Sequence, residues 1–173
     1  MKRFAIWFVS LIVIASALPT AAQFTFDDML SQKRVSDPQL SPDGRYVIYN
    51  VGVVNKAENR VLTQIFRSAV DGSEIKQLTE GNTSNSSGRW SMDGKYIAYN
   101  TGGQIWVMNA DGSGKRQVTK YPTGASGPVW SPDGKWLLFR SDVYPECTTE
   151  ECNTSEEEKA KNSKVQAKIT EPV

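Results

Sequence analysis

One short motif occurs three times in this chain, each time in front of a run of apolar residues. It is Ser-Pro-Asp-Gly-Arg from Ser41, Ser-Met-Asp-Gly-Lys from Ser91 and Ser-Pro-Asp-Gly-Lys from Ser131. Proline fixes φ at the second position of a tight turn, aspartate bonds nearby backbone, and glycine accepts a positive φ, so the motif predicts a turn. We therefore assign a structural role to the repeated turn residues, which are Asp43, Gly44, Asp93, Gly94, Asp133 and Gly134.

The run after each turn is short and rich in aromatic and β-branched side chains. Residues 46–49 are Tyr-Val-Ile-Tyr, and residues 136–139 are Trp-Leu-Leu-Phe. A run of this length is too short for a typical helix, and its unbroken apolar character predicts a strand that is buried on both faces.

A second motif alternates with the first. Residues 64–79 and 104–119 match at an offset of 40, and both contain Asp-Gly between two extended segments, which predicts a β-hairpin. Two alternating motifs with a period of about 40 residues and several short strands are typical of a β-propeller blade. Trp90 and Trp130 precede their turns at equivalent positions and are interpreted as residues that pack between blades.

The spacing of the turns sets the number of blades. The motifs begin at residues 41, 91 and 131, and the ten extra residues of the first interval fall between residues 51 and 62. About three WD40-like blades begin in this chain, whereas a closed propeller needs about four to eight. We expect an all-β fold, an incomplete β-propeller over residues 36–147. Either the sequence is a fragment or a partner supplies the remaining blades.

The N-terminus has the pattern of an export signal. Lys2 and Arg3 precede an uncharged apolar run over residues 4–18, and small residues follow it. This pattern predicts a signal peptide helix over residues 1–22 with cleavage between Ala22 and Gln23, an N-terminal segment over residues 23–35, and a periplasmic or secreted bacterial protein. The alternative is a retained membrane anchor, but the run is shorter than the ~20 residues of a spanning helix.

The two cysteines, Cys147 and Cys152, lie close together in the sequence. In an exported protein this spacing favours a small disulfide loop. A metal site is the alternative, but two thiolates and no histidine form an incomplete zinc set. Residues 148–173 are rich in charge and are interpreted as a charged insertion, as a loop or a short surface helix, followed by a truncated blade end.

Catalytic residues are not expected in this sequence. It has no histidine, so neither a Ser-His-Asp nor a Cys-His arrangement can form within it. The segment Gly124-Ala125-Ser126-Gly127-Pro128 has proline where a nucleophile elbow has its last glycine. We expect no cofactor and no metal. With 20 basic and 19 acidic residues, the net charge of +1 also disfavours nucleic acid and anionic membranes as partners.

Residues 24–30 and 34–44, together with the Ser-Asp-Val-Tyr-Pro-Glu-Cys segment at 141–147, resemble the prolyl oligopeptidase family of serine peptidases. The acylaminoacyl-peptidase and dipeptidyl-peptidase-5-like branch is the most similar. The resemblance implies a propeller that caps a C-terminal α/β-hydrolase domain, where a Ser-Asp-His triad cleaves short peptides near their amino end. This sequence does not contain that domain, so no triad residue can be assigned and we expect the chain to be inactive alone.

A non-enzymatic propeller is the alternative. TolB-like periplasmic proteins use similar Ser-Pro-Asp-Gly blades to bind other proteins. Their repeats are more uniform and follow a separate α/β domain, whereas the opening segment and the charged insertion here suit the peptidase branch.

Overall fold

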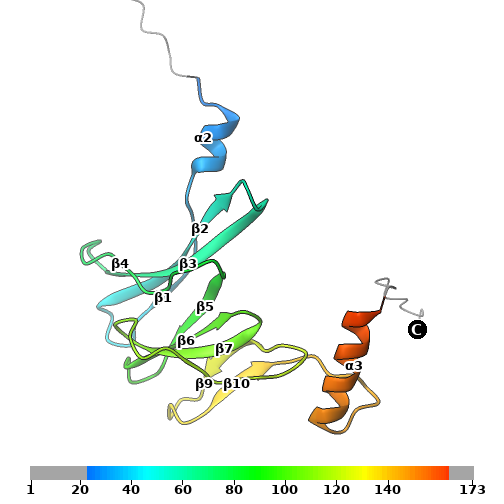
Figure 1. The fold of residues 1–173 in the computed structure, drawn as a ribbon. Coiled ribbons are helices and arrows are strands. Elements are labelled where there is room, and N and C mark those ends of the chain that lie inside the picture. The colour runs from blue at the N-terminus through cyan, green and yellow to red at the C-terminus, as the bar shows by residue number, and fades with distance from the viewer. Residues whose placement is uncertain (1–22, 164–173) are drawn as a thin grey trace, which may run out of the picture. The chain divides into compact units, whose positions relative to one another are not determined.

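The computed structural model describes residues 23–163, in which antiparallel strands are the main regular structure beside two helices (Figure 1). The predicted signal peptide lies outside the described residues, as does Ala22 of the predicted cleavage pair. Of the described residues, 23–32 belong to one unit and 33–163 to a second. Within the first, helix α2 (Phe26–Ser31) begins with a capping box, in which Thr25 and Asp28 bond each other's backbone N–H groups.

The described part of the second unit contains ten strands in three antiparallel sheets, in which strands that follow each other in the sequence are neighbours. The first sheet has the order β1-β2-β3-β4, and its strands are β1 (Arg34–Leu40), β2 (Tyr46–Asn55), β3 (Arg60–Ala69) and β4 (Lys76–Gln77). The second has the order β5-β6-β7-β8, and its strands are β5 (Asn85–Trp90), β6 (Tyr96–Thr101), β7 (Gln104–Asn109) and β8 (Arg116–Gln117). The third pairs β9 (Ser126–Trp130) with β10 (Leu137–Arg140), and helix α3 (Glu150–Asn162) follows it.

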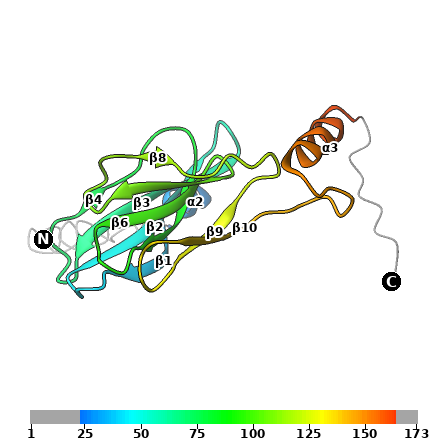
Figure 2. The same ribbon diagram turned by 90° about the horizontal axis from the view of Figure 1, so that it is seen from below.

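These sheets are the blades of a partial propeller, as the repeats predict. The sheet β5–β8 lies between the sheet β1–β4 and the pair β9–β10, and β5 and β9 make the contacts with the preceding sheet (Figures 1 and 2). Two blades have four strands, and the third is represented among the described residues by two strands. The ten extra residues of the first repeat lengthen β2 and β3 and their hairpin, whereas Gly102 and Gly103 close the corresponding turn between β6 and β7.

The three turn motifs fold in the same way. In the first, the Ser41 hydroxyl donates to Asp43 Oδ1 at 2.6 Å and accepts from the Tyr46 backbone N–H at 2.9 Å. Gly44 has a φ of 72°, which favours glycine. The same bonds recur at residues 91–96 and 131–136. Each turn therefore supplies its own side-chain hydrogen bonds.

Each blade also contains a bulge in its first strand that the sequence analysis did not detect. Asp37, Ser87 and Gly127 have φ values of 51°, 56° and 63°, and the pairing register shifts there in all three sheets. The bulge bends the strand. Three different residue types occupy the equivalent position, so the repeat comparison carries no signal for it.

The hydrophobic core lies between the two complete blades. Its buried members are Ile48, Ile65, Leu78, Ile97, Tyr99 and Met108, with Trp90 and Trp106 packed against them. Gly88 permits this close approach, because a Cβ there would lie 3.0 Å from Ile48 Cδ1. Trp90 and Trp130 pack between blades as expected.

The prediction of strands buried on both faces is wrong for the third blade. Ile97 and Ala98 in β6 are fully buried, but Trp136 is 74% exposed and Leu138 in β10 is 71% exposed. The apolar run of β6 has a sheet on either side. Among the described residues, nothing covers the outer face of β10.

Candidate functional site

The aspartates of the turn motifs are placed as structural residues. Asp43, Asp93 and Asp133 each accept hydrogen bonds from the serine hydroxyl and a backbone N–H of their own turn. These bonds stabilise the ionised carboxylate and hold the pKa of each aspartate below its ordinary value. A carboxylate that is ionised and already hydrogen-bonded is poorly suited to act as a general acid or base at neutral pH.

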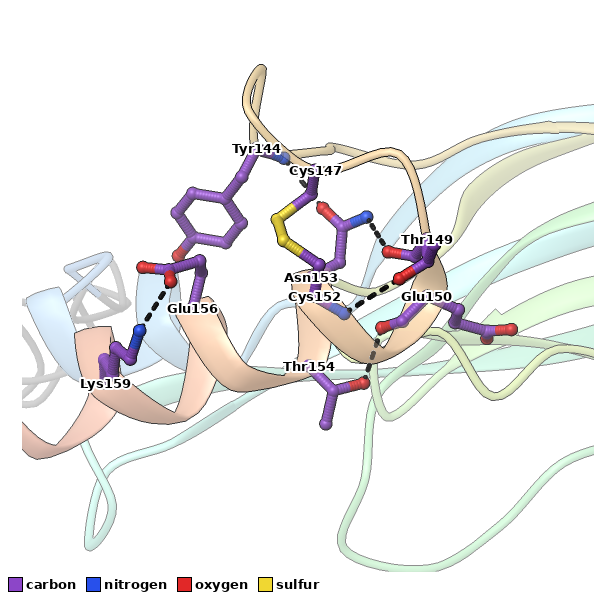
Figure 3. Close-up of a disulfide and its surroundings, with 9 residues drawn as sticks. All are labelled: Tyr144, Cys147, Thr149, Glu150, Cys152, Asn153, Thr154, Glu156 and Lys159. Carbon is purple, nitrogen blue, oxygen red and sulfur yellow. Dashed lines mark hydrogen bonds and ion pairs between the residues drawn. A yellow bond between two sulfur atoms is a disulfide. The ribbon is translucent and has the colours of Figure 1, made fainter.

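The structure pairs Cys147 with Cys152 in a disulfide, directly before and within the first turn of α3 (Figure 3). Their Cα atoms are 5.3 Å apart. The bond joins the loop that leaves β10 to the start of the helix. The charged insertion that the sequence predicts as a loop or surface helix is therefore a helix over Glu150–Asn162 with a covalently closed base.

Besides the disulfide, hydrogen bonds of polar side chains hold α3 to the loop before it (Figure 3). Thr149 caps the helix by accepting from the Cys152 N–H, and Asn153 Oδ1 accepts from the Tyr144 N–H at 2.8 Å. The Tyr144 hydroxyl donates to Glu157 at 3.1 Å. Desolvation and this negative partner raise the pKa of Tyr144 above its ordinary value.

The helix makes few contacts beyond this loop. It has no buried residue and contacts none of the described strands. Ion pairs of Lys159 with Glu156 and of Lys161 with Glu157 lie along its exposed surface. The insertion is thus an independently braced polar element and contributes nothing to the propeller core.

A polar hollow of about 500 Å³ lies where the insertion leaves the third blade. It is formed by the β6–β7 turn, the connection from β8 to β9, and the end of β10; its lining residues are Gly103, Thr123, Gly124, Ala125, Ser126, Arg140, Ser141 and Asp142. The Ser141 hydroxyl donates to Gly124 O at 2.6 Å and fixes the wall. Among the described residues, no hydrogen bond or ion pair engages the Arg140 side chain. A guanidinium without an internal partner is a group that binds peptide carbonyls and carboxylates.

The incomplete nucleophile elbow lies in this hollow without a catalytic partner. Ser126 lines the hollow at the start of β9. The sequence has no histidine to activate its hydroxyl, so the structure supports the interpretation of residues 124–128 as a loop entering a strand. The segment is recognisable in the sequence but the hollow is not, because Arg140, Ser141 and Gly103 meet only in the folded blades.

Neither a metal-ligand cluster nor a membrane-spanning helix is present in the described part of the chain. No group of three or more acidic, cysteine or histidine residues in it could hold a metal ion. Residues 23–163 also include no helix with the length and apolar character needed to cross a membrane.

Sequence comparison relates this chain to bacterial peptidases, although no protein-family model matches it. It is 38% identical over 81 residues to dipeptidyl-peptidase 5 of Porphyromonas endodontalis. The matched region covers 47% of this chain and 12% of that protein. It is 36% identical over 111 residues to dipeptidyl-peptidase 5 of Porphyromonas gingivalis. That matched region covers 60% of this chain and 16% of that protein. The matched part thus spans less than a fifth of these relatives.

Solved structures show the same fold. An acylaminoacyl peptidase from Pyrococcus horikoshii superposes with a TM-score of 0.56 at 22% identity, over 69% of this chain and 19% of that one. A TolB protein from Agrobacterium tumefaciens superposes with a TM-score of 0.52 at 27% identity, over 64% of this chain and 39% of that one. The chain is therefore a partial β-propeller. Its sequence matches confirm the resemblance to the propeller part of prolyl oligopeptidase-family peptidases of the dipeptidyl-peptidase-5-like branch.

Proposed function

We propose that this chain is the propeller part of an exported serine exopeptidase of the dipeptidyl or acylaminoacyl type. The propeller would admit short peptides to an α/β-hydrolase domain that carries the catalytic triad. The observation that carries the proposal is the 36% identity to a dipeptidyl-peptidase 5 over 111 residues, in a chain that is folded as propeller blades.

The hollow at Arg140 gives this role a physical basis. It is open, and it is lined by the Ser126 hydroxyl and the Arg140 guanidinium, to which no other described residue forms a side-chain hydrogen bond or ion pair. These groups offer a passing peptide hydrogen bonds without a deep apolar pocket that would select one side chain. The disulfide-braced helix begins a few residues beyond the hollow, so the insertion is attached at the same end of the blades.

Activity assays of the intact gene product and of this 173-residue chain test the proposal. We expect the intact product to release chromophore from dipeptidyl or acylaminoacyl substrates and to be inactivated by a serine-directed reagent. The chain alone should give no turnover, because a serine nucleophile has no histidine here to act as its base. Hydrolysis by the purified chain alone, or no peptidase activity in the intact product, would contradict the proposal.

Export is part of the same proposal. The charged start, the apolar run and the small residues before Gln23 support a signal peptide over residues 1–22. Mass spectrometry of the protein recovered from the periplasm or medium should find Gln23 at the N-terminus. Recovery of an uncleaved N-terminus from the membrane fraction would instead show a retained anchor.

A protein-binding propeller of the TolB-like kind is the second candidate, and the 27% identity to the Agrobacterium protein favours it. The reading frame beyond Val173 separates the two. A continuing frame with a Gly-x-Ser-x-Gly elbow, followed by aspartate and histidine, supports the peptidase. A frame without these residues, whose product captures a periplasmic protein, supports the binding propeller.

A further inference from the structure

Arg67 in β3 is a charged residue at an interface that the proposed function does not use. Its Nη1 donates to the Ala110 carbonyl of the next blade at 2.9 Å, and its Cζ lies 4.4 Å from the centre of the Tyr46 ring. Its Nε is the only buried side-chain nitrogen or oxygen among the described residues that has no hydrogen-bond partner. Buried polar groups in folded proteins nearly always have a partner, so this one requires an explanation.

The side chain faces a hollow of about 450 Å³ between the two complete blades. The turn at residues 41–46 forms one wall, and Trp90, Met92 and the turn at residues 93–94 form the other. This hollow lies at the turn-motif end of the strands, whereas the Arg140 hollow lies at the opposite end, beside the β6–β7 turn. All of its lining residues belong to the two complete blades.

The neighbouring acidic groups are engaged elsewhere. Asp43 pairs with Arg45 at 3.3 Å, and Asp93 pairs with Lys95 at 3.5 Å. Glu74 accepts the Tyr46 hydroxyl at 3.2 Å. No carboxylate among residues 23–163 forms an ion pair with Arg67. The guanidinium is therefore a partly buried positive charge without a counter-ion.

The next interface of the same chain has a valine where Arg67 stands, although the described part of the third blade has no strand equivalent to β7 and so no counterpart of Ala110. At the offset of 40, the equivalent of Arg67 is Val107, which is 1% exposed. The equivalent hollow, of about 320 Å³, has Tyr96 and the turn at residues 132–134 but no arginine. The bond to Ala110 and the contact with Tyr46 hold the side chain in place, but they do not compensate its charge, which costs stability when it is partly buried without a counter-ion.

We propose that the hollow at Arg67 is a binding site for a carboxylate group. With Nη1 held by Ala110, the carboxylate is taken at the Nη2 side of the guanidinium; Nε is buried in this structure, so a second, parallel hydrogen bond to it forms only when the side chains around it move aside. The Tyr46 ring holds the guanidinium plane from one side, and the Trp90 and Pro42 walls offer apolar contact to the group that bears the carboxylate. The carboxylate is either a free small acid or the acidic side chain or C-terminus of a peptide.

Fluorine NMR of the intact protein labelled with 5-fluorotryptophan tests this site, because Trp90 lines the hollow. The Trp90 signal is assigned from a Trp90→Phe sample. Sodium acetate and a short peptide with a C-terminal glutamate are titrated separately against sodium chloride at equal ionic strength. We expect a saturable shift of the Trp90 signal. Saturation by acetate shows that the site takes a carboxylate alone, and saturation by the peptide only shows that peptide contacts are needed.

Two substitutions and one control complete the test. Arg67→Val copies the residue of the next blade and should abolish the saturable shift while the protein stays folded. Arg67→Lys keeps the charge but lacks the planar guanidinium that bonds Ala110 and the carboxylate at the same time, and it should weaken binding at least tenfold. Arg116→Val removes an exposed arginine of β8 outside the hollow and should leave binding unchanged. No saturable shift in the unsubstituted protein, or an equal shift in Arg67→Lys and Arg116→Val, would overturn the proposal; the lysine variant decides if the valine variant does not fold.

Discussion

The second blade and the strands of the third begin with the same turn and the same kind of apolar run, but bury them differently. Ala98 in β6 is fully buried, whereas Leu138, at the equivalent position of β10, is 71% exposed. Tyr96 and Trp136 differ in the same sense, at 40% and 74% exposed. The turn bonds are equal in the two blades. The comparison shows that a blade forms locally and that its neighbours decide how much of it is buried.

In the first blade, too, burial depends on a neighbouring blade, in this case the one that would precede it. Trp90 Nε1 donates to the Gln39 carbonyl at 3.2 Å, and Trp130 Nε1 donates to the Arg89 carbonyl at 3.0 Å, so each blade bonds to the one before it. Leu40 occupies the equivalent position of the first blade and is 59% exposed. Among the described residues, no earlier blade covers it.

Truncation of apolar side chains should separate the two regions most strongly. Ile97→Ala removes a fully buried side chain between the complete blades and should lower the free energy of unfolding by about 2–5 kcal/mol. Leu138→Ala should change it by less than about 0.5 kcal/mol, because the side chain is already in water. Urea unfolding followed by circular dichroism measures both. A large loss from Leu138→Ala would break the comparison by showing that other residues cover β10.

The indole hydrogen bonds offer a smaller and more specific test. Trp90→Phe and Trp130→Phe should each lower the free energy of unfolding by about 1 kcal/mol, because each leaves a half-buried carbonyl without its donor. Trp136→Phe is the control, since that side chain is mostly exposed and its indole nitrogen bonds no described residue. The urea midpoints of the three variants measure this. If only Trp90→Phe lost stability, the two indole hydrogen bonds would not stabilise their blade interfaces in the same way.

Acid should produce the smallest difference, since it acts on turns that are the same in both regions. The pKa values of Asp93 and Asp133 are lowered from 3.8 by their serine and backbone donors. Their contribution to stability is therefore complete above the unfolded value and is lost as the pH falls through the lower folded value. Urea midpoints should stay level from pH 7 to 5 and fall below about pH 4. Asp93→Asn and Asp133→Asn should reduce this acid dependence equally, and an effect of Asp93→Asn alone would show that the turn depends on its neighbours.

Much of the fold could be predicted from short-range patterns. The turns at Ser41, Ser91 and Ser131 and the hairpins at Asp71 and Asp111 lie where their residues indicate, because each motif supplies its own hydrogen bonds and φ values. The strand bulges were missed because Asp37, Ser87 and Gly127 share a conformation without sharing a residue type.

The candidate sites were less accessible to sequence reasoning. The Arg140 hollow joins three connections that are far apart in the chain, and the Arg67 hollow joins two blades. Arg67 did carry a detectable signal, since it breaks the repeat at a position where the next blade has Val107. Its meaning depends on the missing counter-ion, and only the packed blades show which charges are near.

The sequence by itself determined that this protein is built of repeated blades, because turns and strands arise from interactions between residues a few positions apart. Only the tertiary structure decided which apolar runs are buried, which charges lack partners and where hollows open. Burial and ion pairing depend on what lies beside a residue in space, and the residues of a repeated motif do not specify which blades will pack against it.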